Sequence, residues 1–231
     1  MFDAAVRFFQ EGGVFMYPIA VVLVVGLAVA IERLVILSAA RTNNRRAFDR
    51  ILPLLKKRDY AAIIDLGRSS GAPISRIIAA GIARMQHTPH RDEIEYAMEE
   101  GVMEAVPRLE KRTAYIATLA NIATLLGLLG TIMGLIAAFT AVANANPSEK
   151  AALLSQSISV AMNTTAFGLM AAIPLLLLHT AIQNKTTEII DSLEMAGVKT
   201  LNIISNSDAF NGRTRTADSA TAASAAKPRT L

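Results

Sequence analysis

Residues 114–145 contain no Asp, Glu, Lys, Arg or His, and this uninterrupted apolar stretch constrains the fold more than any other feature. At about 1.5 Å per residue, a helix of this length is longer than the hydrocarbon core of a bilayer is thick. Residues 151–182 form a second apolar stretch, in which His179 is the only titratable group. The chain is 52% hydrophobic, which is unusual for a water-soluble domain. We therefore expect helices that cross a membrane.

A third apolar stretch lies near the N-terminus, and the charges around it predict its orientation. Val14–Ile31 carries no charge, and Glu32 and Arg33 follow near its inner end. This run is longer than the apolar core of a signal peptide, so we expect an uncleaved anchor. Lys and Arg gather in residues 38–112 and after residue 182, and they are sparse in the other connections. Because basic residues favour the cytoplasmic side, the N-terminus is predicted outside and the C-terminus inside.

The predicted fold is an all-α membrane protein with three transmembrane helices, two of them long and extending into the cytoplasm, and a helical cytoplasmic domain. Gly71-Ala72-Pro73 and Thr88-Pro89 predict breaks in that domain. The helix over 92–110 is expected to run without interruption into the second span. The predicted segments are a periplasmic N-terminus (1–13), transmembrane helix 1 (14–37), the cytoplasmic helical domain (38–112), transmembrane helix 2 (113–145), a periplasmic loop (146–152), transmembrane helix 3 (153–182), a cytoplasmic helical extension (183–205) and a disordered tail (206–231).

Small residues line one side of each of the last two spans. On a helical wheel, the small side of the second span holds Ala120, Thr124, Gly127, Thr131, Gly134 and Ala138. The small side of the third span holds Ala161, Thr165, Gly168 and Ala172. One interpretation is that both stripes are seams where helices pack closely. The other is that Thr131 and Thr165 face a polar ion path or a partner helix.

The residue inventory argues against several classes of function. The chain has no cysteine, and His87 and His90 beside Pro89 are expected to be exposed loop residues rather than metal ligands. We find no arrangement of catalytic residues, so we expect no enzyme, no cofactor and no metal. The basic residues follow the expected membrane topology, which predicts lipid rather than nucleic acid as the surroundings.

The last two spans also contain no carboxylate, although a proton relay normally needs a titratable group at membrane depth. Either a partner inserts such a group or the chain has no proton path. Glu32 near the inner end of the first span is a candidate second group. Its pairing with Arg33, or with a neighbouring subunit, is the favoured interpretation.

Four short motifs carry a family resemblance. They are IERL at 31–34, LEKR at 109–112, LLGLLGTIMG at 125–134 and TTAFGLMAAIP at 164–174. Together with the three-span order and the short outer hairpin, they resemble the MotA/TolQ/ExbB proton channel family, most nearly its ExbB/TolQ branch. The resemblance covers residues 10–200 approximately.

The resemblance implies a homopentameric ring in the bacterial inner membrane that uses the proton motive force for transport or envelope maintenance. Its pore would hold a dimer of a single-span ExbD/TolR-like partner whose aspartate carries the proton, and a TonB/TolA-like protein would be a further partner. Thr131 and Thr165 would then be pore residues. The helix-packing or pore face would consist of Gly127, Gly134, Ala161, Gly168 and Ala172. Many members carry a glutamate where this chain has Val160, so a non-conducting membrane scaffold remains the alternative.

Overall fold

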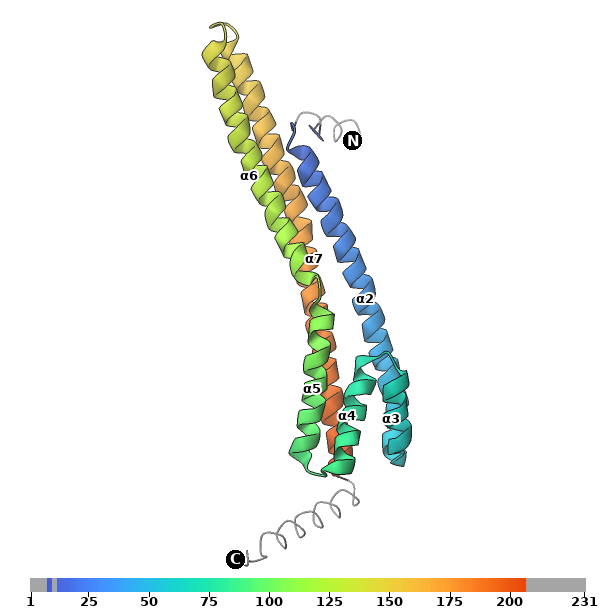
Figure 1. Ribbon diagram of the computed structural model, residues 1–231. Helices are drawn as coiled ribbons and strands as arrows, with labels where there is room; N and C mark the ends of the chain where they lie inside the picture. The colour runs from blue at the N-terminus through green and yellow to red at the C-terminus, as the bar shows by residue number, and fades with distance from the viewer. Residues whose placement is uncertain (1–7, 10–11, 207–231) are drawn as a thin grey trace, which may run out of the picture. The chain divides into compact units, whose positions relative to one another are not determined.

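The computed structural model describes residues 8–9 and 12–206 (Figure 1). These residues form helices and short connections, and no strand occurs among them, which confirms the predicted all-α class. Most of the predicted periplasmic N-terminus lies outside the described residues. The predicted disordered tail also lies outside them, apart from Asn206, which ends a turn.

Three of the long helices carry apolar stretches that are long enough to cross a membrane, as predicted. These helices are α2, α6 and α7. In chain order the elements are α2 (Met16–Lys57), α3 (Tyr60–Ser69), α4 (Pro73–His87), α5 (Arg91–Glu110), α6 (Thr113–Asn144) and α7 (Lys150–Ser205).

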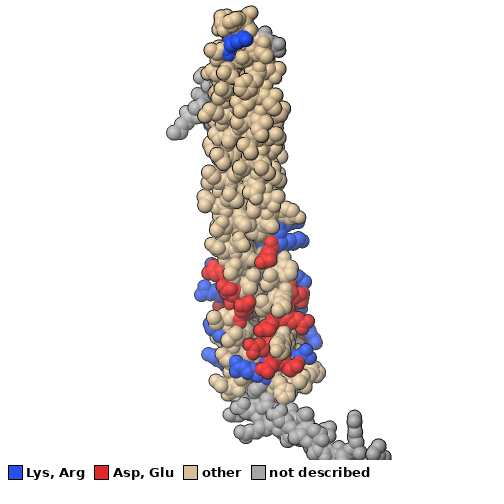
Figure 2. Space-filling model, turned by 90° about the vertical axis from the view of Figure 1, so that its left-hand side faces the viewer, with Lys and Arg blue, Asp and Glu red and all other residues tan. Residues whose placement is uncertain are grey.

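The chain divides into two compact units. Unit 1 comprises the residues up to Val35 together with Lys111–Asn184, and unit 2 comprises Ile36–Glu110 together with the residues from Lys185 onward. On the face drawn in Figure 2, the acidic and basic side chains gather on unit 2, whereas the surface of unit 1 is almost wholly uncharged. This separation of charge is typical of a protein with one unit in the hydrocarbon core of a bilayer and one unit in water.

In unit 1, α6 and the first part of α7 form an antiparallel hairpin (Figure 1). The turn between them spans residues 145–149, close to the predicted loop. The bulky side of α6 points away from α7 and is exposed, at Ile122, Leu125, Leu129, Ile132, Met133 and Ile136. The two sides of α6 therefore have different neighbours, as the helical wheel predicts. In a membrane the bulky side meets lipid or another subunit.

Helix α2 packs against α7 in unit 1 at a glycine. A Cβ placed on Gly26 would lie 2.7 Å from the nearest methyl carbon of Leu175. Leu175 is fully buried, as are Ile19 and Ala30 on α2. The absent side chain at Gly26 thus leaves room for a leucine from the other helix, and the first span is attached to the hairpin by apolar contact.

Unit 2 is a bundle in which α4 packs on both α3 and α5. Its fully buried side chains are mostly isoleucines, namely Ile51, Ile63, Ile77, Ile78, Ile82 and Ile94. The start of α3 is fixed by Asp59, whose Oδ1 accepts a hydrogen bond from the Ala62 backbone N–H at 3.2 Å. Pro73 is the first residue of α4, as expected from the favourable φ of proline at this position.

The predicted breaks at residues 71–73 and 88–89 are confirmed, but the expected continuity between 92–110 and the second span is wrong. A turn at Lys111 and Arg112 separates α5 from α6, while Pro107 lies inside α5. Arg112 adopts a left-handed conformation with φ 65°. Glycine usually occupies such positions, so the sequence carries no signal for this turn. The Arg112 guanidinium donates to Glu32 Oε1 at 2.7 Å, a contact that helps to hold the turn.

The contact between α3 and α4 yields a stability prediction. Gly67→Val should lower the midpoint of thermal unfolding of the detergent-solubilised protein, because a Cβ there would lie 2.3 Å from Ala79 Cβ and 3.0 Å from the Ser75 carbonyl oxygen. Overpacking of this kind costs about 1–3 kcal/mol. Gly71→Val is the matched control, since no atom lies within 4 Å of its Cβ position. Equal midpoints for the two variants would contradict the described packing of α3 on α4.

Candidate functional site

Thr131 on α6 and Thr165 on α7 meet inside the hairpin. Their hydroxyl oxygens are in direct hydrogen-bond contact. Both also reach the carbonyl oxygen of Gly127, at 2.9 Å from Thr165 Oγ1 and 3.3 Å from Thr131 Oγ1. Both threonines are only partly buried. The two residues that the sequence singles out are therefore brought together, with one backbone carbonyl, into a polar cluster that we call the threonine pair.

The threonine pair uses its own hydrogens internally. Each hydroxyl has a single hydrogen to donate and two lone pairs that accept. In the arrangement with the shortest hydrogen bonds, Thr165 donates to the Gly127 carbonyl and Thr131 donates to Thr165. No O–H then remains for an outside group, while unused lone pairs remain on both oxygens. Toward any incoming group, the pair is an acceptor of hydrogen bonds.

Glycines bring the two helices close enough for this contact. A Cβ on Gly168 would lie 2.8 Å from the Ala123 carbonyl oxygen and 2.9 Å from Gly127 Cα, so backbone meets backbone. A Cβ on Gly134 would lie 2.8 Å from Ala161 Cβ. These small residues thus lie on the seam between α6 and α7 of one chain, as the helix-packing interpretation expects, whereas Thr124 on the predicted small side is exposed. Ala172 is also buried. A pore-lining role for these residues stays a prediction.

A second polar contact joins the hairpin to the segment before α2, and sequence reasoning missed it. Thr164 is 2% exposed. Its hydroxyl lies 2.6 Å from the Gly12 carbonyl oxygen and 2.9 Å from the Val160 carbonyl oxygen. Its methyl group fills the space over Gly130, where a Cβ would lie 2.3 Å from it. The Thr164-Thr165 dipeptide could have signalled this arrangement, because adjacent helical residues face different neighbours.

The phenylalanine three residues after Thr164 reinforces the same attachment. Phe167 makes edge-to-face contacts with Phe8 and Phe9, at ring-centroid distances of 6.4 and 5.7 Å. Aromatic pairs in this geometry contribute about 0.5–1.5 kcal/mol beyond the area that they bury. The described N-terminal residues are therefore packed on α7 beside the threonine pair.

The acidic group near the inner end of the first span has a partner that the sequence did not predict. Glu32 forms an ion pair with Arg112 at 2.7 Å, in addition to being the chain neighbour of Arg33. The Glu32 and Arg112 side chains are both substantially exposed, so the pair contributes at most about 1 kcal/mol in water. Arg33 itself is buried at 3% exposure. The charges of Glu32, Arg33 and Arg112, the N-cap residue of α6, are close enough to interact with one another.

Carboxylates are absent from the spans of the hairpin. Within Thr113–Asn184 the only acidic residue is Glu149, which lies in the turn between α6 and α7. His87 and His90 are exposed, as expected, but only His90 lies in the loop, since His87 is the last residue of α4. No group of three or more His, Cys, Asp or Glu that could hold a metal ion occurs in the described part of the chain. The hairpin offers hydroxyls and a carbonyl, and the only titratable group within its spans, His179, lies near the inner end of the third span, away from the threonine pair in the sequence.

Comparison with known proteins shows that residues 69–195, more than half of the chain, match the model of the MotA/TolQ/ExbB proton channel family. A protein of Methanothermobacter thermautotrophicus, named as a biopolymer transport protein ExbB homologue, is 28% identical over 84% of this chain and 68% of its own length. An ExbB-like protein of Synechocystis is 28% identical over 73% of this chain and 80% of its own length. The Tol-Pal system protein TolQ of Haemophilus influenzae is 30% identical over 40% of each chain.

The glycine crossing yields a second prediction. Gly168→Ala should lower the thermal unfolding midpoint in detergent, because the new methyl group meets the backbone at Ala123 and Gly127, which cannot give way as a flexible side chain can. We expect a loss of about 1–3 kcal/mol. Gly197→Ala on the same helix is the control, since its nearest neighbour would be Met98 Sδ at 3.8 Å. A stabilising effect at both positions would show that helix propensity outweighs the crossing.

Proposed function

Because the chain belongs to the MotA/TolQ/ExbB proton channel family, we propose that it is an ExbB/TolQ-like subunit of an ion-driven motor in the bacterial inner membrane. In this proposal copies of the chain form a ring, a pentamer by analogy, around a dimer of an ExbD/TolR-like single-span partner. The proton motive force then energises transport or envelope maintenance, with a TonB/TolA-like protein as the recipient. The N-terminus is outside and the C-terminus is inside.

The observation that carries the proposal is the threonine pair in a hairpin whose spans lack carboxylates. A polar cluster at membrane depth is costly unless its groups are satisfied or used. Both hydroxyl hydrogens are donated within the pair and to Gly127. The oxygens still have lone pairs that can accept further hydrogen bonds, and both threonines are partly exposed. Such a cluster assists proton transfer when a second molecule brings a carboxyl group to it, because the spans have none and His179 is 14 residues from Thr165 along the chain. The carboxylate therefore comes from a partner helix.

The hydrogen-bond polarity of the pair indicates which form of that carboxylate it would recognise. A protonated carboxyl group has an O–H to donate, whereas a carboxylate only accepts. Since Thr165 donates its hydrogen to the Gly127 carbonyl and Thr131 donates its hydrogen to Thr165, the pair would stabilise the protonated, neutral acid. Neutralising the partner's carboxyl group in this way would let its helix move past the hairpin without the penalty of a buried charge.

Removing the hydroxyls tests the proposal. Thr131→Val and Thr165→Val keep the shape of the side chain but remove the acceptor oxygens. In vesicles that contain the chain with an ExbD/TolR-like protein from the same organism, each variant should reduce proton flux about tenfold or more, by analogy with the cost of a lost hydrogen bond. A pH-sensitive dye trapped in the vesicles measures the flux, and native mass spectrometry of the extracted complex should show an unchanged ring.

Two matched controls are available on the same helices. Thr118 on α6 and Thr180 on α7 are exposed, and each donates its hydroxyl to the backbone of its own helix. Thr118→Val and Thr180→Val should therefore leave the flux unchanged. Full flux in both Thr131→Val and Thr165→Val would return the pair to a packing role. Absence of flux in the unaltered complex, with assembly intact, would support the non-conducting scaffold.

A further inference from the structure

Unit 2 contains a cavity of about 290 Å³ where α2, the first turn of α4 and α7 come together. Three cationic residues line it, namely Arg41 and Arg45 on α2 and Lys199 on α7. Asn44 on α2 and Ile74 on α4 complete its inner side. The lining residues come from segments that are far apart in the sequence, so the cationic wall is a product of the fold. The proposed ion path, in unit 1, does not include any of these residues.

Asn44 gives this cavity a specific chemical requirement. Its side chain is 3% exposed. Its Oδ1 accepts a hydrogen bond from the Ile74 backbone N–H at 3.5 Å, and since an N–H only donates, this contact sets the orientation of the amide. The buried Nδ2 then has no hydrogen-bond partner among the described residues. Buried polar groups are nearly always partnered, so an acceptor is missing at this position.

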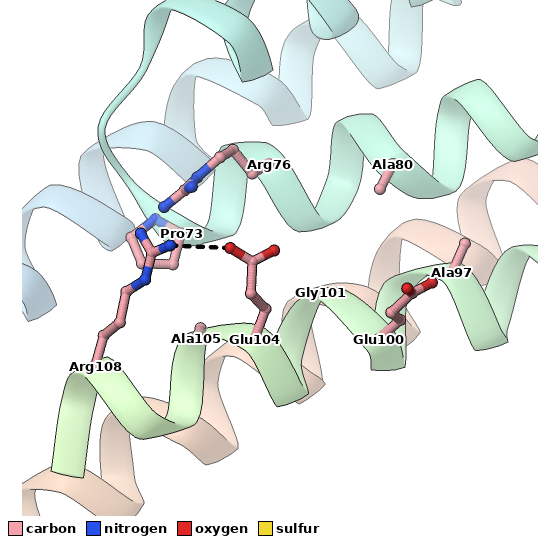
Figure 3. A pocket seen from close by; sticks show the side chains of 9 residues that line it. All are labelled: Pro73, Arg76, Ala80, Ala97, Glu100, Gly101, Glu104, Ala105 and Arg108. Carbon is pink, nitrogen blue, oxygen red and sulfur yellow. Dashed lines mark hydrogen bonds and ion pairs between the residues drawn. The ribbon is translucent and has the colours of Figure 1, made fainter. Parts of the chain in front are cut away.

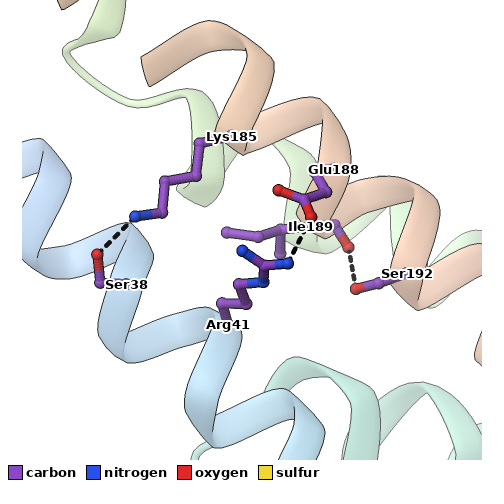
Figure 4. A network of polar contacts seen from close by, with 6 residues as sticks. All are labelled: Ser38, Arg41, Lys185, Glu188, Ile189 and Ser192. Atoms are coloured by element: carbon purple, nitrogen blue, oxygen red, sulfur yellow. Dashed lines mark hydrogen bonds and ion pairs between the residues drawn. The ribbon is translucent and has the colours of Figure 1, made fainter. Parts of the chain in front are cut away.

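The charges around Asn44 indicate that the missing acceptor is an anion. Arg41 is neutralised by Glu188 at 2.5 Å (Figure 4). Arg45 and Lys199 form no ion pair with another described residue. The N-terminus of α4 also lies at this cavity, and its N-cap residue Ala72 has no side-chain acceptor for the backbone N–H groups of the first turn. A helix N-terminus with two available cations and an amide donor is suited to a phosphate group.

Other cavities in unit 2 fit an anion less well. The groove between α4 and α5 (Figure 3) is lined by both signs of charge, and Arg108 is already paired with Glu104 at 3.0 Å across one turn. A groove between α5 and α7 is lined by Glu95, Glu99 and Glu194 and is acidic. Of these three cavities, which the described residues of unit 2 form, the cavity at Asn44 alone combines unpaired cations with an unpartnered buried donor.

We propose that this cavity binds the phosphate group of an organic phosphate. The phosphate oxygens accept from Asn44 Nδ2 and pair with Arg45 and Lys199, while Phe48 and Met195 in the cavity wall contact the organic part. Asn44 follows the predicted end of the first span, residue 37, by about 10 Å of helix. This depth is close to the headgroup layer of a bilayer. The phosphate therefore belongs either to a lipid headgroup or to a soluble metabolite.

Two binding measurements on the full chain distinguish the two sources. In the first, glycerol 3-phosphate is titrated into the protein in a neutral detergent and the heat of binding is recorded. In the second, the protein is extracted from mixed vesicles of phosphatidylglycerol and phosphatidylcholine, and retained lipid is identified by native mass spectrometry. Saturable binding of glycerol 3-phosphate supports a soluble ligand. Selective retention of phosphatidylglycerol alone supports a lipid headgroup.

Asn44→Asp tests the site directly. Aspartate keeps the acceptor for Ile74 but replaces the donor with a negative charge, so binding in either measurement should be lost while the thermal midpoint of the free protein is maintained. Arg45→Gln and Lys199→Gln should each weaken binding about tenfold. Arg46→Gln is the matched control, because Arg46 is exposed and does not line the cavity. No binding of either probe by the unaltered chain, or binding by Asn44→Asp and Lys199→Gln as tight as that of the unaltered chain, would overturn the proposal.

Discussion

The backbone-to-backbone approach of α6 and α7 at Gly127 and Gly168 is the contact on which the rest of unit 1 depends. Lipid tails are as apolar as leucine, so burial of apolar surface does not pull helices together inside a bilayer. Close packing and hydrogen bonds must do so instead. The two glycines let the helix axes come near enough for Thr165 to reach the Gly127 carbonyl across the seam. The same approach places the two threonine hydroxyls in contact.

The close approach of α6 and α7 also determines how the first span is attached to the hairpin. With α6 and α7 tightly paired, Thr164 and Phe167 lie beside the pair and face the N-terminal segment. Deeper in the span, Gly26 receives Leu175. At the inner end, Glu32 meets Arg112. The first span is thus attached to the hairpin by a hydroxyl, an apolar contact and an ion pair in succession, each of which depends on where the hairpin places its side chains.

Most of the fold could be predicted because its signals are local. Apolar length identifies the spans, and Pro73 and Pro89 mark the breaks in the charged segment through the geometry of proline alone. The small stripes left two interpretations open, a packing seam or a face toward a polar path. The turn at Arg112 could not be predicted, since an arginine in a left-handed conformation leaves no local signal and is held by Glu32, 80 residues away. The same holds for Thr164 and Asn44, whose roles depend on Gly12 and Ile74, which only the fold brings near.

The threonine pair was foreseen as two residues and not as one unit. Helical periodicity places each threonine on a small face, but it does not say whether the faces meet each other or a third helix. The structure pairs them. If the proposed ion path passes this pair, its free lone pairs accept from groups that donate, such as a protonated acid or the water around a cation, whereas an anion finds no donor there.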